Sequence, residues 1–168
     1  MPIAEVTGYN LSLFLHVTAV VVGFGATFAE SVAFPVAVKA GVKHLPYLHR
    51  LQLAINQYFA LPALVIVLAT GFYQVADRDW DLGELWLSGT LAIVVIIAVL
   101  NLAYFIPSDR RLGPMAERDI AAAGGGDVEL SSFSEDYRKQ ARTQGMLGAL
   151  TGLLLVVAIF LMVTKPGV

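Results

Sequence analysis

Four long apolar blocks constrain this chain more than any other feature of its sequence. They run from about 9 to 34, 51 to 75, 85 to 106 and 145 to 164. A helix needs roughly 20 apolar residues, at about 1.5 Å of rise each, to cross the hydrocarbon core of a bilayer. Only 14% of the 168 residues are charged, whereas about a quarter are charged in a soluble domain. The sequence therefore predicts an all-α integral membrane protein, with residues 1–168 forming one domain, a four-helix bundle in the lipid bilayer.

The distribution of basic residues predicts the orientation of the bundle. Nine of the 11 Lys and Arg residues lie in the first and third connections: Lys39, Lys43, Arg50, Arg110, Arg111, Arg118, Arg138, Lys139 and Arg142. The other two are Arg78, in the second connection, and Lys165, after the fourth block. Basic connections tend to stay in the cytoplasm. We therefore expect up-down topology in a bacterial inner membrane, with both termini outside and the connection 107–144 in the cytoplasm.

Polar side chains inside the blocks are few, and most of them fall in the expected cytoplasmic half. Glu30 lies about one turn from the inner end of the first block, and Asn56 and Asn101 lie at similar depth in the second and third. Because ionisable groups in a membrane need a partner or a cavity, we predict a polar cluster in which Arg142 neutralises Glu30. Asn56 or Asn101 would donate a hydrogen bond to the same carboxylate. The alternative is that Glu30 reaches the headgroups or is protonated.

A single histidine, His16, lies in the apolar blocks, about two turns from the outer end of the first. One interpretation is a hydrogen-bonded core residue. Its partner could then be any of four hydroxyl residues in the outer half: Ser12, Thr18, Ser88 and Thr90. A histidine at a fixed depth in a four-helix bundle is also how haem can be held. Met162 is the methionine at roughly matching depth for a second axial ligand, so both interpretations stay open.

The other two histidines do not predict a metal site. His44 and His49 are five residues apart across Pro46, which does not match the i, i+4 spacing of a helical metal pair. We expect both side chains to be interfacial and solvated. The chain has no cysteine, so thiolate ligands and cysteine nucleophiles are excluded.

Small residues predict close helix packing at two places. Gly23 lies midway along the face of the first block that carries His16 and Glu30. In the fourth block, Gly148 and Gly152 form a G-x-x-x-G motif that Gly145 extends. This motif leaves two alternatives open: packing against the first block, or a face for a homodimer or another membrane subunit.

Two further local predictions concern helix continuity. Pro62 lies inside the second block and is expected to kink it, freeing a backbone carbonyl about one turn earlier. The stretch "LGPMAERDIAAAG" is expected to form a short amphipathic helix on the membrane surface, with Met115 and Ile120 toward lipid. Further along, Ser132 and Glu135 have the spacing of a capping box. No internal repeat is evident.

The stretch "LFLHVTAVVVGFGATF" and the "LGPM" of Leu112 to Met115 resemble a loose group of small bacterial membrane proteins. One branch is an uncharacterised family of predicted integral membrane proteins, described only as a domain of unknown function. More distant relatives are the copper-resistance protein D family and the four-helix protoporphyrinogen oxidases, which are haem proteins. The oxidase resemblance implies that His16 matches a haem ligand. This chain departs from these relatives in having no lysine inside a block and no Met- and His-rich outer motif.

The sequence contains no P-loop, no dinucleotide fingerprint and no nucleophile, base and orienting residue in a recognisable set. We therefore expect a non-catalytic accessory or interaction protein that binds no nucleic acid. The first alternative is a redox protein that binds haem b through His16; catalysis, if present, would be that of a haem-linked membrane oxidoreductase. The second alternative is a small-solute or proton pathway that uses Glu30.

Overall fold

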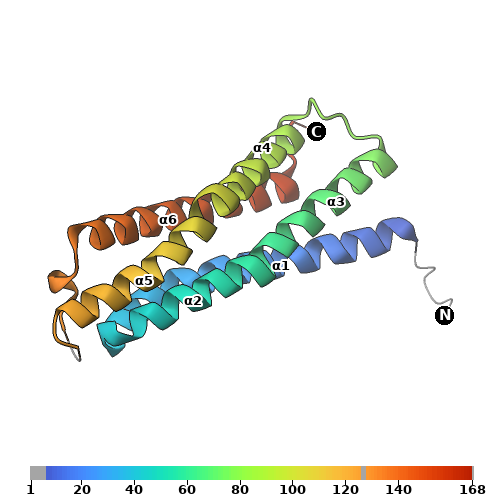
Figure 1. Cartoon of the computed structure of the whole chain (residues 1–168). Helices are drawn as coiled ribbons and strands as arrows, with labels where there is room; N and C mark the ends of the chain where they lie inside the picture. Colours follow the sequence, from blue (N-terminus) through green and yellow to red (C-terminus); the bar gives the residue numbers. More distant parts are fainter. Residues whose placement is uncertain (1–6, 126–127, 168) are drawn as a thin grey trace.

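The computed structural model describes residues 7–125 and 128–167, and four long helical rods form its frame (Figure 1). The rods have these elements: α1 (Gly8–Ala40); η1 (Val42–His44), α2 (Leu45–Ile55), η2 (Asn56–Ala60) and α3 (Leu61–Arg78); α4 (Leu85–Leu100), η3 (Asn101–Phe105) and α5 (Ile106–Ala122); and α6 (Glu135–Thr164), preceded by the short η4 (Leu130–Ser132). All four rods are long and apolar enough to cross a membrane. The prediction of an all-α, four-span bundle is confirmed.

The rods are longer than the expected spans. They contain 33, 37, 38 and 30 residues, so each is at least about 45 Å long at 1.5 Å per residue. The hydrocarbon core of a bilayer is only about 30 Å thick. A sizeable part of the helical structure therefore projects beyond the lipid tails.

At one end of the molecule, aromatic rings and cations gather. The guanidinium of Arg78 lies 4.0 Å from the centre of the Tyr9 ring. The ammonium of Lys165 lies 4.2 Å from the ring centre of Trp80 and 4.9 Å from that of Trp86. These contacts bring together the start of α1, the connection between α3 and α4, and the residue that follows α6. We call this the Trp80 end.

At the opposite end, which we call the Tyr137 end, the helices enclose a dense apolar core. Its buried members come from the α1–α2 connection, α2, α5, the residue that follows η4 and the start of α6: Val42, Leu45, Leu48, Leu112, Ala116, Phe133 and Tyr137. Met115 and Ile120 pack against this core. The expected amphipathic surface helix is therefore wrong, because α5 continues the third rod and uses its apolar side to pack against protein.

The start of α6, at this core, has a hydrogen-bonded cap. Ser134, two residues later than expected, is the N-cap of α6, and its hydroxyl accepts from the backbone N–H of Tyr137. The Ser134 hydroxyl and backbone N–H both donate to Asp119 of α5, at 2.6 and 2.9 Å. The buried carboxylate of Asp119 thus fixes the start of α6 against α5.

Two π-helical segments interrupt the second and third rods at matching sequences. η2 begins at Asn56 in "NQYFALP", and η3 begins at Asn101 in "NLAYFIP". Each has a proline six residues after the asparagine, Pro62 or Pro107. A proline ring clashes with the carbonyl four residues earlier, and the wider π turn is one way to accommodate it. The two rods therefore share an Asn-x5-Pro spacing, and the expected disturbance at Pro62 takes the form of a π segment.

Candidate functional site

An elongated cavity of about 940 Å³ runs between the helices. Its lining extends from Trp80 and Lys165 at one end to His49 and Gln52 toward the other, and most of it is apolar. In Figure 1, α1 runs beside α3 and α4 runs beside α6, and residues of all four helices line the cavity. Pockets that bind small molecules and cofactors span about 300–1,000 Å³ and are mainly apolar with a few polar groups. The cavity is therefore the candidate functional site.

His16 lines the cavity from α1, and one ring nitrogen is held by α3. Its Nδ1 lies 2.9 Å from the hydroxyl oxygen of Thr70. That hydroxyl donates its own proton to the carbonyl oxygen of Ile66, at 2.6 Å. Thr70 can therefore only accept from His16, which places the proton of the neutral imidazole on Nδ1. Nε2 is then the unprotonated nitrogen, and an unprotonated ring nitrogen is the one that can ligate a metal.

None of the four expected partners is the one that bonds His16. Ser12 donates to the backbone of Thr70 and accepts from Gln74, while Ser88 and Thr90 donate to carbonyls of their own helix. Thr18 is exposed. Sequence reasoning missed Thr70 because no periodicity connects α1 with α3. The expected second ligand, Met162, lines the same cavity from α6.

Toward the Tyr137 end, buried polar groups form a continuous hydrogen-bonded chain. Asn101 donates to the Oδ1 of Asn56 at 2.8 Å, and Asn56 donates to the Oδ2 of Asp109 at 3.1 Å. Gln144 of α6 donates to the other oxygen of Asp109. Ser108 donates to Gln144 at 2.6 Å. The two asparagines therefore bond to each other, and the carboxylate that Asn56 reaches is that of Asp109, which the sequence analysis did not name.

Asp109 is the centre of this network, and only 2% of its surface is exposed. Sequence reasoning assigned it to the solvated connection because the apolar block ends near 106. The helix instead continues through η3 into α5, and the π segment shifts the face on which later residues lie. The repeated Asn-x5-Pro spacing was the available signal, since it marks both helices at the same place.

Glu30 lines the cavity at this level, but its predicted ion pair is absent. The Oε1 of Glu30 is buried and has no hydrogen-bond partner among the described residues. Arg142 lies on the exposed surface of α6. It lies two positions before Gln144, which corresponds to about 200° around a helix. The face of α6 that presents Gln144 to the bundle therefore turns Arg142 away from it.

His49 is buried rather than solvated, with 1% of its surface exposed. Its Nδ1 lies 3.2 Å from the Oε1 of Gln52, which can only accept, so Nδ1 carries the proton. Its Nε2 lies 2.8 Å from the hydroxyl of Tyr137 and accepts from it. Both ring nitrogens are thus occupied. Across residues 7–125 and 128–167, no group of three or more His, Cys, Asp or Glu could hold a metal ion.

The predicted packing glycines differ in their surroundings. A Cβ built on Gly23 would lie 3.3 Å from the Cβ of Ala63, so α1 and α3 approach closely there. A Cβ on Gly145 or Gly148 would meet nothing within 4 Å, and one on Gly152 would touch only the ring of Phe28. Gly145 and Gly148 line the cavity. The small residues of α6 therefore border open space within the chain.

Comparison with known proteins yields one finding. A family model described as "Predicted integral membrane protein (DUF2269)" matches residues 10–166. No curated protein and no solved structure matches the chain.

Proposed function

Since the chain belongs to this family of predicted integral membrane proteins, we propose that it holds a haem-type cofactor in the cavity between its helices. The observation that carries the proposal is the free Nε2 of His16 in an apolar cavity, with the tautomer set by Thr70. The resemblance to copper-resistance protein D and to protoporphyrinogen oxidases stays a prediction.

Three properties of the cavity fit such a cofactor. Its volume of about 940 Å³ lies within the range of cofactor sites. The lining is mainly apolar, as the face of a porphyrin requires. His16 on α1 and Met162 on α6 both line the cavity, and they are the residues that would hold the iron. Haem held by histidine and methionine supports one-electron transfer, so the chain's role would be to bind the cofactor, exclude water and set its potential.

The test is the absorption spectrum of the full-length protein, purified in detergent from cells supplied with haem. We expect a Soret band that shifts on reduction with dithionite. His16→Ala should abolish this band, and Met162→Leu should change the reduced spectrum while the band persists. His44→Ala, which removes an exposed histidine, is the matched control and should leave the spectrum unchanged. A colourless wild-type protein would overturn the proposal and favour the expected accessory role.

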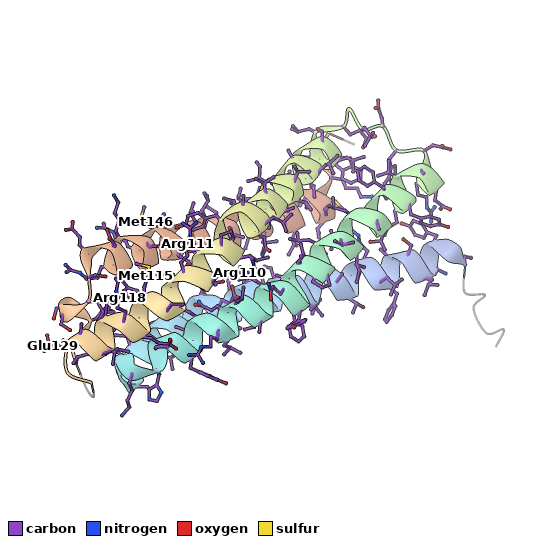
Figure 2. All side chains as sticks on the ribbon, in the orientation of Figure 1. Arg110, Arg111, Met115, Arg118, Glu129 and Met146 are labelled. Atoms are coloured by element: carbon purple, nitrogen blue, oxygen red, sulfur yellow. The ribbon has the colours of Figure 1, made fainter. Side chains whose placement is uncertain are left out.

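The orientation is part of the same proposal. We place the Trp80 end outside a bacterial inner membrane and the Tyr137 end in the cytoplasm, with the four rods in up-down order. The exposed Arg110 and Arg111 on α5 support this orientation, since they lie beyond the apolar part of the third rod, and Arg118 follows them along the same helix (Figure 2). Basic residues favour the cytoplasmic side.

A further inference from the structure

The hydrogen-bond directions around Asp109 leave one buried acceptor without a donor. A carboxylate only accepts, so Asn56 must turn its NH₂ group toward Asp109. The Oδ1 of Asn56 must then accept from the NH₂ group of Asn101. The Oδ1 of Asn101 is therefore directed elsewhere. It has no partner in the described part of the chain, although only 4% of the Asn101 side chain is exposed.

A second acceptor without a donor belongs to Glu30. Its Oε1 is also buried and unpartnered, and both Glu30 and Asn101 line the cavity. The charge of Asp109 acts on Glu30, so two carboxyl groups share a region shielded from water. Among the residues that the structure describes, no Lys or Arg forms an ion pair with either of them. In the described ranges, this region therefore offers buried oxygen acceptors and no basic side chain that forms an ion pair with them.

We propose that this part of the cavity binds one small monovalent cation, such as Na⁺, through the carboxylate of Glu30 and the amide oxygen of Asn101. Asp109 acts at a distance: it adds negative charge and, through Asn56, turns the Asn101 oxygen away from the amide network. Hard cations prefer oxygen ligands of this kind. This cation site lies toward the Tyr137 end of the cavity, away from His16, and does not depend on haem binding.

The chemistry of the site favours a monovalent over a divalent ion. Divalent cations are usually held by several carboxylates. Here a single carboxylate, that of Glu30, lines the cavity, while both oxygens of Asp109 already accept from amide groups. The absence of a cluster of three acidic or histidine side chains from the described ranges agrees with this choice.

Binding of radiolabelled Na⁺ to the full-length protein in detergent tests the proposal directly, and thermal unfolding tests it independently. We expect saturable Na⁺ binding and a higher melting temperature in NaCl than in choline chloride of equal ionic strength. Glu30→Gln should reduce Na⁺ affinity at least about tenfold, because a charge at contact distance is lost. It should also remove the salt-specific stabilisation without lowering stability, because the repulsion by Asp109 is lost as well.

Two further variants make the result specific. Asn101→Asp should raise Na⁺ affinity, since it adds charge at the ligand position, and Glu117→Gln, which removes an exposed carboxylate, should change nothing. Equal stabilisation by choline and Na⁺ would overturn the proposal. So would stability that follows pH alone with no Na⁺ binding, because Glu30 would then be neutralised by a proton.

Discussion

Thr70 shows how a single side chain can define the chemistry of another. Its hydroxyl proton is committed to the carbonyl of Ile66, so it can offer His16 only a lone pair. The imidazole therefore presents Nε2, and not Nδ1, as its free nitrogen. Asp109 acts in a similar way. It orients the amide group of Asn56, which in turn orients the amide group of Asn101. At the scale of residues, the site is determined by groups that sequence reasoning left out.

We expect Thr70→Val to loosen His16 without removing it. The buried imidazole would lose its acceptor, which should lower the free energy of unfolding by about 1 kcal/mol. Thr70→Ser keeps the hydroxyl and should behave like the wild type. Denaturation in mixed micelles measures both effects. Equal loss of stability in the two variants would show that the methyl group, and not the hydrogen bond, is what matters.

At the scale of elements, the four long helical rods were predictable from the sequence. The π segments that interrupt two of them were not. The four blocks predicted four rods because length and hydropathy suffice for that inference. The π segments at Asn56 and Asn101 were missed, because each rod reads as a continuous helix on either side of them. The polar cluster was therefore only half predicted. Asn56 and Asn101 lie close enough to form a hydrogen bond, whereas the face that Asp109 presents depends on the turn that the π segment adds.

The close approach of α1 and α3 gives a prediction with a matched control two residues away. Gly23→Leu should push α1 from Ala63, and such overpacking typically costs about 1–3 kcal/mol. Gly25→Leu should cost much less, since a Cβ there meets nothing within 4 Å and the residue is exposed. Thermal unfolding in detergent compares the two. A similar cost for both would mean that loss of glycine, and not contact with α3, destabilises the helix.

The whole molecule combines a densely packed end with an open middle. The core at the Tyr137 end includes Leu45, Leu112 and Tyr137, all with 0% of their surface exposed. Along α1, by contrast, only Ser12 and Ala19 are buried. Most of the α1 surface that a soluble bundle would bury against protein therefore faces either the cavity or the outside of the bundle.

The proposed orientation is directly testable, because the natural chain has no cysteine. A single cysteine at Gly167, beyond α6, should react with a membrane-impermeant maleimide added to intact spheroplasts. A cysteine at Gly124, in the α5–α6 connection, should react only after the membrane is opened. The reverse pattern would place the basic connections outside and contradict the proposed topology.

The packed core at the Tyr137 end also bears on how this protein is made. Because α2, α5 and the start of α6 contact one another directly in this core, we expect the Tyr137 end to assemble without any bound molecule. The newly made chain would then insert into the bilayer before its cavity is filled. Filling that interior becomes a separate, later event in biogenesis, one that cells could time by the supply of whatever enters.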